Sequence, residues 1–197
     1  VYARADYYSL GGTTTAVGVD ATSITADVNV TNSGVIQATA SAYYGGASAT
    51  AVNAIGVVGT YIDGAYHGYI TVDNSGTIGA TSLGGAYTAY AVVEATGVNA
   101  MSYLANYGVY VYNTGEINAT ATTGDYSYYS SAIARGVNAE NTYYGVYVYN
   151  GGTITATATA GAGDSYNYDN QADAYGITVY GVYGDIAVVN MGEVSAT

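Results

Sequence analysis

The chain has 197 residues and a formal net charge of −12, with 14 acidic residues against two arginines. Because no basic patch can neutralise phosphates, this composition excludes nucleic-acid binding and attraction to an anionic membrane. Gly and Tyr are abundant, at 28 and 26 residues, and Pro, Cys, Trp, Phe and Lys are absent. Small and β-branched residues dominate over charged helix formers, which predicts an all-β protein.

One motif, [VI]-x-V-x-N-x-G-x-[IV]-x-A-T, occurs five times along the chain. Its copies occupy residues 28–39, 70–81, 109–120, 146–157 and 186–197. The alternation on each side of N-x-G predicts two strands with one apolar face each. Because Asn and Gly tolerate positive φ, we expect the chain to turn a corner between these strands.

In the third copy, Val109 and Val111 are expected to point inward, and Tyr110 and Tyr112 outward. The recurring Asn and Gly residues are expected to form a structural turn ladder, with each amide stacked on the next copy. The ladder residues are Asn32, Asn74, Asn113, Asn150, Asn190, Gly34, Gly76, Gly115, Gly152 and Gly192. A ligand contact is the alternative, but five matching turns favour a structural role.

The spacing of the central asparagines is 42, 39, 37 and 40 residues, which predicts a β-solenoid of five repeats of about 40 residues. A second motif, A-x-G-[VI], lies between the copies at residues 16–19, 54–57, 95–98, 134–137 and 174–177. Counting its glycines with those of the main motif gives a mean step of about 19 residues. This half-period favours two coils per repeat. A single wide coil with loops is the alternative.

The motif V-x-N-x-G-x-I-x-A-T, with its Tyr- and Gly-rich spacers, resembles the passenger regions of bacterial autotransporters and filamentous-haemagglutinin-type adhesins. The resemblance covers nearly the whole chain. It implies a right-handed parallel β-helix displayed outside a Gram-negative cell. We expect residues 1–197 to form a single β-solenoid domain that is a segment of a longer array or a fibre subunit, because neither polar caps, a signal peptide nor a membrane barrel is evident.

Tyrosine carries the most suggestive surface signal. Tyr110 aligns with Tyr147 and Tyr112 with Tyr149, which predicts rows of phenols on one outer face. Tyr supplies rigid area with a polar tip, as interfaces and sugar stacking require, although stacked rings also stabilise neighbouring strands. The adjacent pairs of the spacers are further candidates for surface contact: Tyr128, Tyr129, Tyr143 and Tyr144.

We expect no catalytic residue, no metal and no cofactor. His67 is the only histidine, and the 14 acids are scattered, without the clustered carboxylates that polysaccharide cleavage needs. The loop at 161–173 holds three acids but matches no calcium motif. The column Thr39, Thr81, Thr120, Thr157 and Thr197 raises ice binding as an alternative, although its neighbouring column varies.

The function predicted from the sequence is a non-enzymatic, extracellular β-solenoid that forms a rod or fibre with a Tyr/Thr/Asn-rich interaction surface. Expected partners are other copies, through end-to-end or lateral contacts, and cell-surface glycans or other cells. Neither nucleic acid nor direct membrane insertion of this segment is expected. A polysaccharide-binding or polysaccharide-cleaving β-helix is the alternative.

Overall fold

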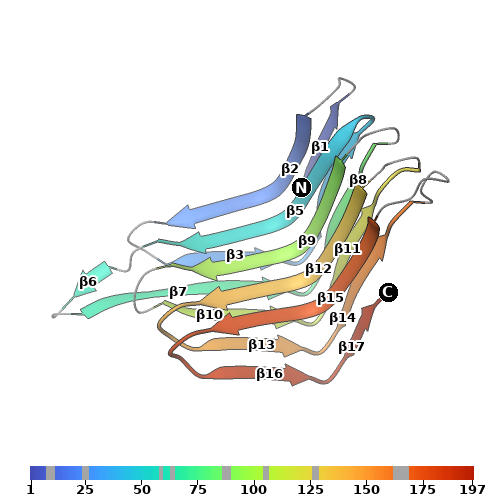
Figure 1. Ribbon diagram of the computed structural model, residues 1–197. Helices are drawn as coiled ribbons and strands as arrows, with labels where there is room; N and C mark the ends of the chain where they lie inside the picture. The colour runs from blue at the N-terminus through green and yellow to red at the C-terminus, as the bar shows by residue number, and fades with distance from the viewer. Residues whose placement is uncertain are drawn as a thin grey trace.

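The computed structural model describes residues 1–7, 12–23, 27–57, 60–62, 65–85, 90–103, 107–125, 129–161 and 169–197. Within these ranges the chain is all β, and its strands stack into three parallel sheets that share one interior (Figure 1). The predicted β-solenoid is thereby confirmed. The coils follow one another from the N-terminal to the C-terminal end, so that residues about 40 apart lie in adjacent layers.

The three sheets are named here by the strands that form them. Sheet A contains β1 (Tyr2–Tyr7), β4 (Val35–Ala42), β8 (Thr77–Leu83), β11 (Glu116–Thr122), β14 (Thr153–Thr159) and β17 (Glu193–Ala196). Sheet B contains β2 (Gly12–Ser23), β5 (Gly45–Gly56), β9 (Tyr90–Ser102), β12 (Tyr129–Asn141) and β15 (Asp169–Gly181). Sheet C contains β3 (Val28–Asn32), β7 (Ala65–Asn74), β10 (Tyr107–Asn113), β13 (Val146–Asn150) and β16 (Ile186–Asn190). The short β6 (Thr60–Ile62) pairs antiparallel with β7 and projects to one side of the stack (Figure 1).

Each of the first four repeats makes one coil of three strands, one in each sheet, and the fifth contributes β16 and β17. The third repeat, for example, runs through β10, β11 and β12. The next strand, β13, then pairs in parallel with β10. The expectation of two coils of about 20 residues per repeat is therefore not met, and the wide single coil is the correct alternative. The N-x-G turn joins sheet C to sheet A, and the spacer between copies supplies the long strand of sheet B.

The half-period glycines mark a bend inside sheet B and not the start of a second coil. Gly97 and Gly136 lie opposite each other but are left out of the strand pairing, which continues in the same register on both sides. At this point two consecutive residues are buried, so the usual alternation of buried and outward residues is interrupted. A Cβ on Gly97 would lie 2.5 Å from Cγ2 of Ile117 on the opposite sheet, so only a very small residue fits. The residue that lies opposite Gly97 in the neighbouring strand β5 is Ala51. The A-x-G-[VI] match at 54–57, which placed Gly56 at this bend, is therefore wrong.

The interior is narrow and apolar, as the pattern of small and branched residues predicted. Sheet C contributes paired Val and Ile side chains, such as Val109 and Val111, which are fully buried. Sheet A contributes an Ile followed by Ala residues, and sheet B contributes Ala and Val. Because each inward position repeats in register from coil to coil, like side chains stack on like and form one continuous core.

The N-x-G glycines of the second to fifth copies are required for close packing between coils, and none of the N-x-G glycines has the positive φ that the sequence suggested. Among the described glycines only Gly45 has a positive φ, at 103°. A Cβ on Gly115 would instead collide with the carbonyl oxygen of Gly76 in the preceding coil and lie 2.7 Å from the carbonyl carbon of Ser75. The same glycine column is tied by backbone hydrogen bonds, for example from the N–H of Glu116 to the oxygen of Gly76 at 2.8 Å.

Gly115→Ala is therefore expected to destabilise the fold by roughly 1–3 kcal/mol, because the added methyl group forces two tightly stacked turns apart. Gly34→Ala is the matched control in the same column, since a Cβ there meets no atom within 4 Å. This control should change stability by less than about 1 kcal/mol. Urea denaturation followed by circular dichroism measures both, and equal effects of the two substitutions would contradict the packing explanation.

Candidate interaction surfaces

A column of asparagine side chains, the asparagine ladder, runs along the corner between sheets C and A and is buried in all but the last coil. Its members are Asn32, Asn74, Asn113, Asn150 and Asn190, which lie opposite one another in register. In every coil but the last, Nδ2 donates a hydrogen bond to Oδ1 of the next asparagine, at 2.7 Å from Asn74 to Asn113 and from Asn113 to Asn150. The two terminal links are 2.8 Å long.

The amides of the first four ladder asparagines also donate to the backbone of their own turn and of the next coil. Nδ2 of Asn113 lies 3.2 Å from the carbonyl oxygens of both Gly115 and Thr153. Buried amides of this kind are costly when unpaired, so this repeated set of partners holds every turn in the same conformation. The ladder therefore locks the corner and fixes the register between coils.

The outer face of sheet C carries the tyrosine patch. It consists of Tyr69, Tyr110, Tyr112, Tyr147 and Tyr149. The ring of Tyr110 folds back over Gly108, where a Cβ would lie 2.6 Å from its Cε2 atom. The hydroxyl of Tyr149 lies 3.8 Å from the sulfur of Met191 in the next coil.

The rings of the tyrosine patch contact one another both within a strand and between coils. The centroids of Tyr112 and Tyr147 are 5.6 Å apart with a tilt of 45°, and those of Tyr110 and Tyr147 are 6.5 Å apart. Tyr69 continues the contact into the second repeat, 5.8 Å from Tyr110. Partial burial raises the pKa of the Tyr112 phenol above its usual value, with smaller contributions from Tyr147, Tyr110 and Asp73, so this group stays neutral at physiological pH.

The remaining tyrosine candidates lie at other corners of the solenoid. Tyr143 stacks on Tyr183 of the next coil at 5.7 Å, and Tyr144 is exposed beside it. Tyr129 stacks on Tyr90 at 5.1 Å with an angle of 7° between their planes. Tyr128, which was also a candidate, lies outside the described residues.

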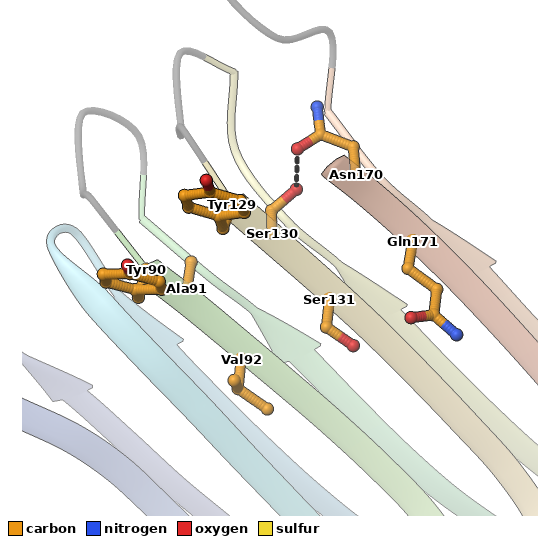
Figure 2. A pocket seen from close by; sticks show the side chains of 8 residues that line it. All are labelled: Tyr90, Ala91, Val92, Tyr129, Ser130, Ser131, Asn170 and Gln171. Carbon is orange, nitrogen blue, oxygen red and sulfur yellow. Dashed lines mark hydrogen bonds between the residues drawn. The ribbon is translucent and has the colours of Figure 1, made fainter. Parts of the chain in front are cut away.

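A groove of about 430 Å³, called here the sheet B groove, opens beside the Tyr90–Tyr129 stack at the start of β9, β12 and β15 (Figure 2). Its lining residues are Tyr90, Ala91, Val92, Tyr129, Ser130, Ser131, Asn170 and Gln171. The hydroxyl of Ser130 donates to Oδ1 of Asn170 at 2.8 Å, which ties β12 to β15 within the lining of the groove (Figure 2). The sequence gives no signal for this groove, because Tyr90, Ser131 and Gln171 are successively about 40 residues apart and share no motif.

A second polar column, also missed, crosses sheet B on its outer face. Nδ2 of Asn138 donates to Oδ1 of Asn99 at 2.9 Å, and Nδ2 of Asn99 donates to Oδ1 of Asn53 at 2.8 Å. The column continues to Asp20, which accepts from Asn53 at 2.9 Å. These amides donate toward the N-terminal coil, opposite in direction to the asparagine ladder. The recurring G-V-N of 97–99 and 136–138 was the available sequence signal.

The other sequence candidates are distributed as follows. The threonine column occupies the outer face of sheet A, with Thr81 paired in register to Thr39 and Thr120. Within the described ranges, no cluster of three or more His, Asp or Glu side chains could hold a metal ion. Of the segment 161–173, which was expected to be a loop, residues 162–168 lie outside those ranges and residues 169–173 begin β15. No helix in the described part of the chain is long and apolar enough to cross a membrane.

Comparison of the chain with protein-family models, with curated proteins and with solved structures gives no match. The strand topology and register show a β-helix repeat protein. Membership of the autotransporter or filamentous-haemagglutinin group stays a prediction from the repeat motif.

Asn113→Ala should destabilise the fold by roughly 1–3 kcal/mol, because it removes a buried acceptor from Asn74 and a buried donor from Asn150. Asn190→Ala, in the exposed last coil, should cost less because water can replace the lost bond. Thermal unfolding followed by circular dichroism compares the two variants. A loss at Asn113 no larger than that at Asn190 would show that the ladder does not stabilise the interior coils.

Proposed function

We propose that this chain is a non-enzymatic, extracellular structural and adhesive β-solenoid, which forms a rod or fibre at a bacterial cell surface. The observation that carries the proposal is the unbroken asparagine ladder through all five repeats. The coils are kept in register along their whole length by this ladder and by the backbone pairing of three sheets. Such an arrangement favours a stiff rod whose outer side chains are free to make contacts.

In the 197-residue chain, apolar side chains of the last coil are exposed, and the end-to-end version of the proposal would use them. Ile186 and Val188 of β16 are 49% and 47% exposed, whereas their counterparts Val146 and Val148 in β13 are buried. The outer edge of β16 also carries backbone groups that a further strand would pair. Another coil, from the same polypeptide or from a second copy, would cover these side chains and extend all three sheets.

The assembly version of the proposal is tested with lysine substitutions on β16. Ile186→Lys combined with Val188→Lys places charge on the exposed core edge and should abolish end-to-end association. Ala187→Lys is the matched control, because Ala187 shares the outward column of Tyr147. Sedimentation velocity over a range of concentrations, with electron microscopy, compares both variants with the unaltered chain.

We expect concentration-dependent filaments from the unaltered chain and from Ala187→Lys, and monomers from the double variant. Unaltered chains that remain monomeric at high concentration would contradict the fibre-subunit version. They would leave the adhesive role to be tested by the glycan experiment below.

The sheet B groove favours a more specific adhesive role, the binding of a neutral glycan. Tyr90 is 72% exposed and Tyr129 39% exposed, so parts of both stacked rings remain open to solvent. Sugars present apolar C–H faces that pack on aromatic rings, and hydroxyls that bond to side chains such as Ser131 and Gln171. None of the eight lining residues is charged, and the chain carries a net charge of −12, which disfavours anionic sugars.

The glycan role is tested on an array of neutral and anionic oligosaccharides. Tyr90→Ala combined with Tyr129→Ala should weaken binding to neutral glycans by roughly tenfold or more, since the stacking surface is lost. The control is Tyr143→Ala combined with Tyr183→Ala, which removes another stacked pair away from the groove. Selective binding of anionic glycans, or equal losses in the two double variants, would contradict the assignment of this site.

A further inference from the structure

The tyrosine patch holds phenol rings of consecutive coils within reach of one another. The centroid distance from Tyr112 on β10 to Tyr147 on β13 is 5.6 Å, the shortest interval within the patch. Their strands are hydrogen-bonded in a fixed parallel register, and the ring of Tyr110 lies against both. Because both rings are held on a rigid sheet, the fold sets their relative position, and contact between them does not depend on random collision.

The composition of the chain makes tyrosine the main target of one-electron oxidants. Cys and Trp are absent, so neither a thiol nor an indole competes for the oxidant. The two methionines, Met101 and Met191, are instead converted to sulfoxides by oxygen transfer. A radical formed in the tyrosine patch therefore has another tyrosine as its nearest redox partner.

We propose that Tyr112 and Tyr147 are an oxidative cross-linking site, which forms a dityrosine bond between two coils. Hydrogen peroxide acting through a haem peroxidase removes one electron and one proton from each phenol. The two ring radicals then join through a carbon–carbon bond between their Cε positions, and the displaced ring hydrogens return the oxygens to phenols. Two phenols and one peroxide give one dityrosine and two waters, so the chain loses two hydrogen atoms.

This bond would act as a covalent link in a chain that has no disulfides. It closes a loop of 35 positions between Tyr112 and Tyr147, so it restricts the unfolded chain in the way that a disulfide does. In the folded state the link spans neighbouring strands that are already paired. The inference rests on the fold alone and is independent of the proposed adhesive role.

The test treats the full chain at low concentration with horseradish peroxidase and hydrogen peroxide, and maps the products by mass spectrometry. Cleavage at Asp and Glu after denaturation places Tyr112 in the peptide 95–116 and Tyr147 in the peptide 141–164. We expect these two peptides to be joined, with a mass lower by two hydrogens, in a monomeric product that shows dityrosine fluorescence. Fragmentation of the joined peptides should place the bond between Tyr112 and Tyr147.

Tyr112→Phe and Tyr147→Phe remove only a hydroxyl each and should abolish this joined pair, while circular dichroism confirms that the fold is kept. Tyr175→Phe is the control, because that ring packs against the guanidinium of Arg135, 5.9 Å from its centroid, on sheet B. The cross-linked monomer should unfold at a higher temperature than the untreated chain. Cross-links found only between molecules, or a pair that survives in both patch variants or forms equally in denaturant, would overturn the proposal.

Discussion

The structure depends on one repeated interaction, the hydrogen bond between the buried side-chain amides of consecutive ladder asparagines. An asparagine amide is both donor and acceptor, so each residue in a column of asparagines can donate a hydrogen bond to one neighbour and accept one from the other, whatever the length of the column. The bond forms only when successive turns lie at strand spacing, and from the second copy on this requires the glycine two residues after each asparagine. The pair N-x-G therefore sets the rise of the solenoid, and each coil copies the geometry of the one before.

The narrow core follows from the same constraint. Three sheets that face one interior leave little room, so branched side chains of sheet A face glycines of sheet B. Ile117 packs where sheet B has Gly97, and Ile154 where it has Gly136. The glycines of sheet B thus leave room for the side chain that packs against them, and the turn glycines leave room for the backbone of the preceding coil. Stability comes from tight stacking of small residues, since the chain has no disulfide.

The outside of the solenoid is less constrained than its inside, and differences between repeats accumulate there. The outward column of sheet C changes from Asn29 and Thr71 to Tyr110 and Tyr147 without disturbing the buried column next to it. A rigid backbone then turns these changes into extended surfaces, because side chains of successive coils lie at strand spacing. The tyrosine patch and the sheet B groove are two such surfaces, and the proposed cross-linking and glycan binding rest on them.

The sequence by itself determined the all-β class, the repeat of about 40 residues, and which side chains of each motif face the core, because a period of two and five matching copies leave little freedom. Only the tertiary structure decided that each repeat makes one coil. A glycine at half the repeat length is compatible both with the start of a second coil and with a bend inside one strand, so the sequence pattern does not distinguish the two. The role of Gly115 and the meeting of Tyr90 with Tyr129 were likewise decided by contacts between coils, which lie far apart along the chain.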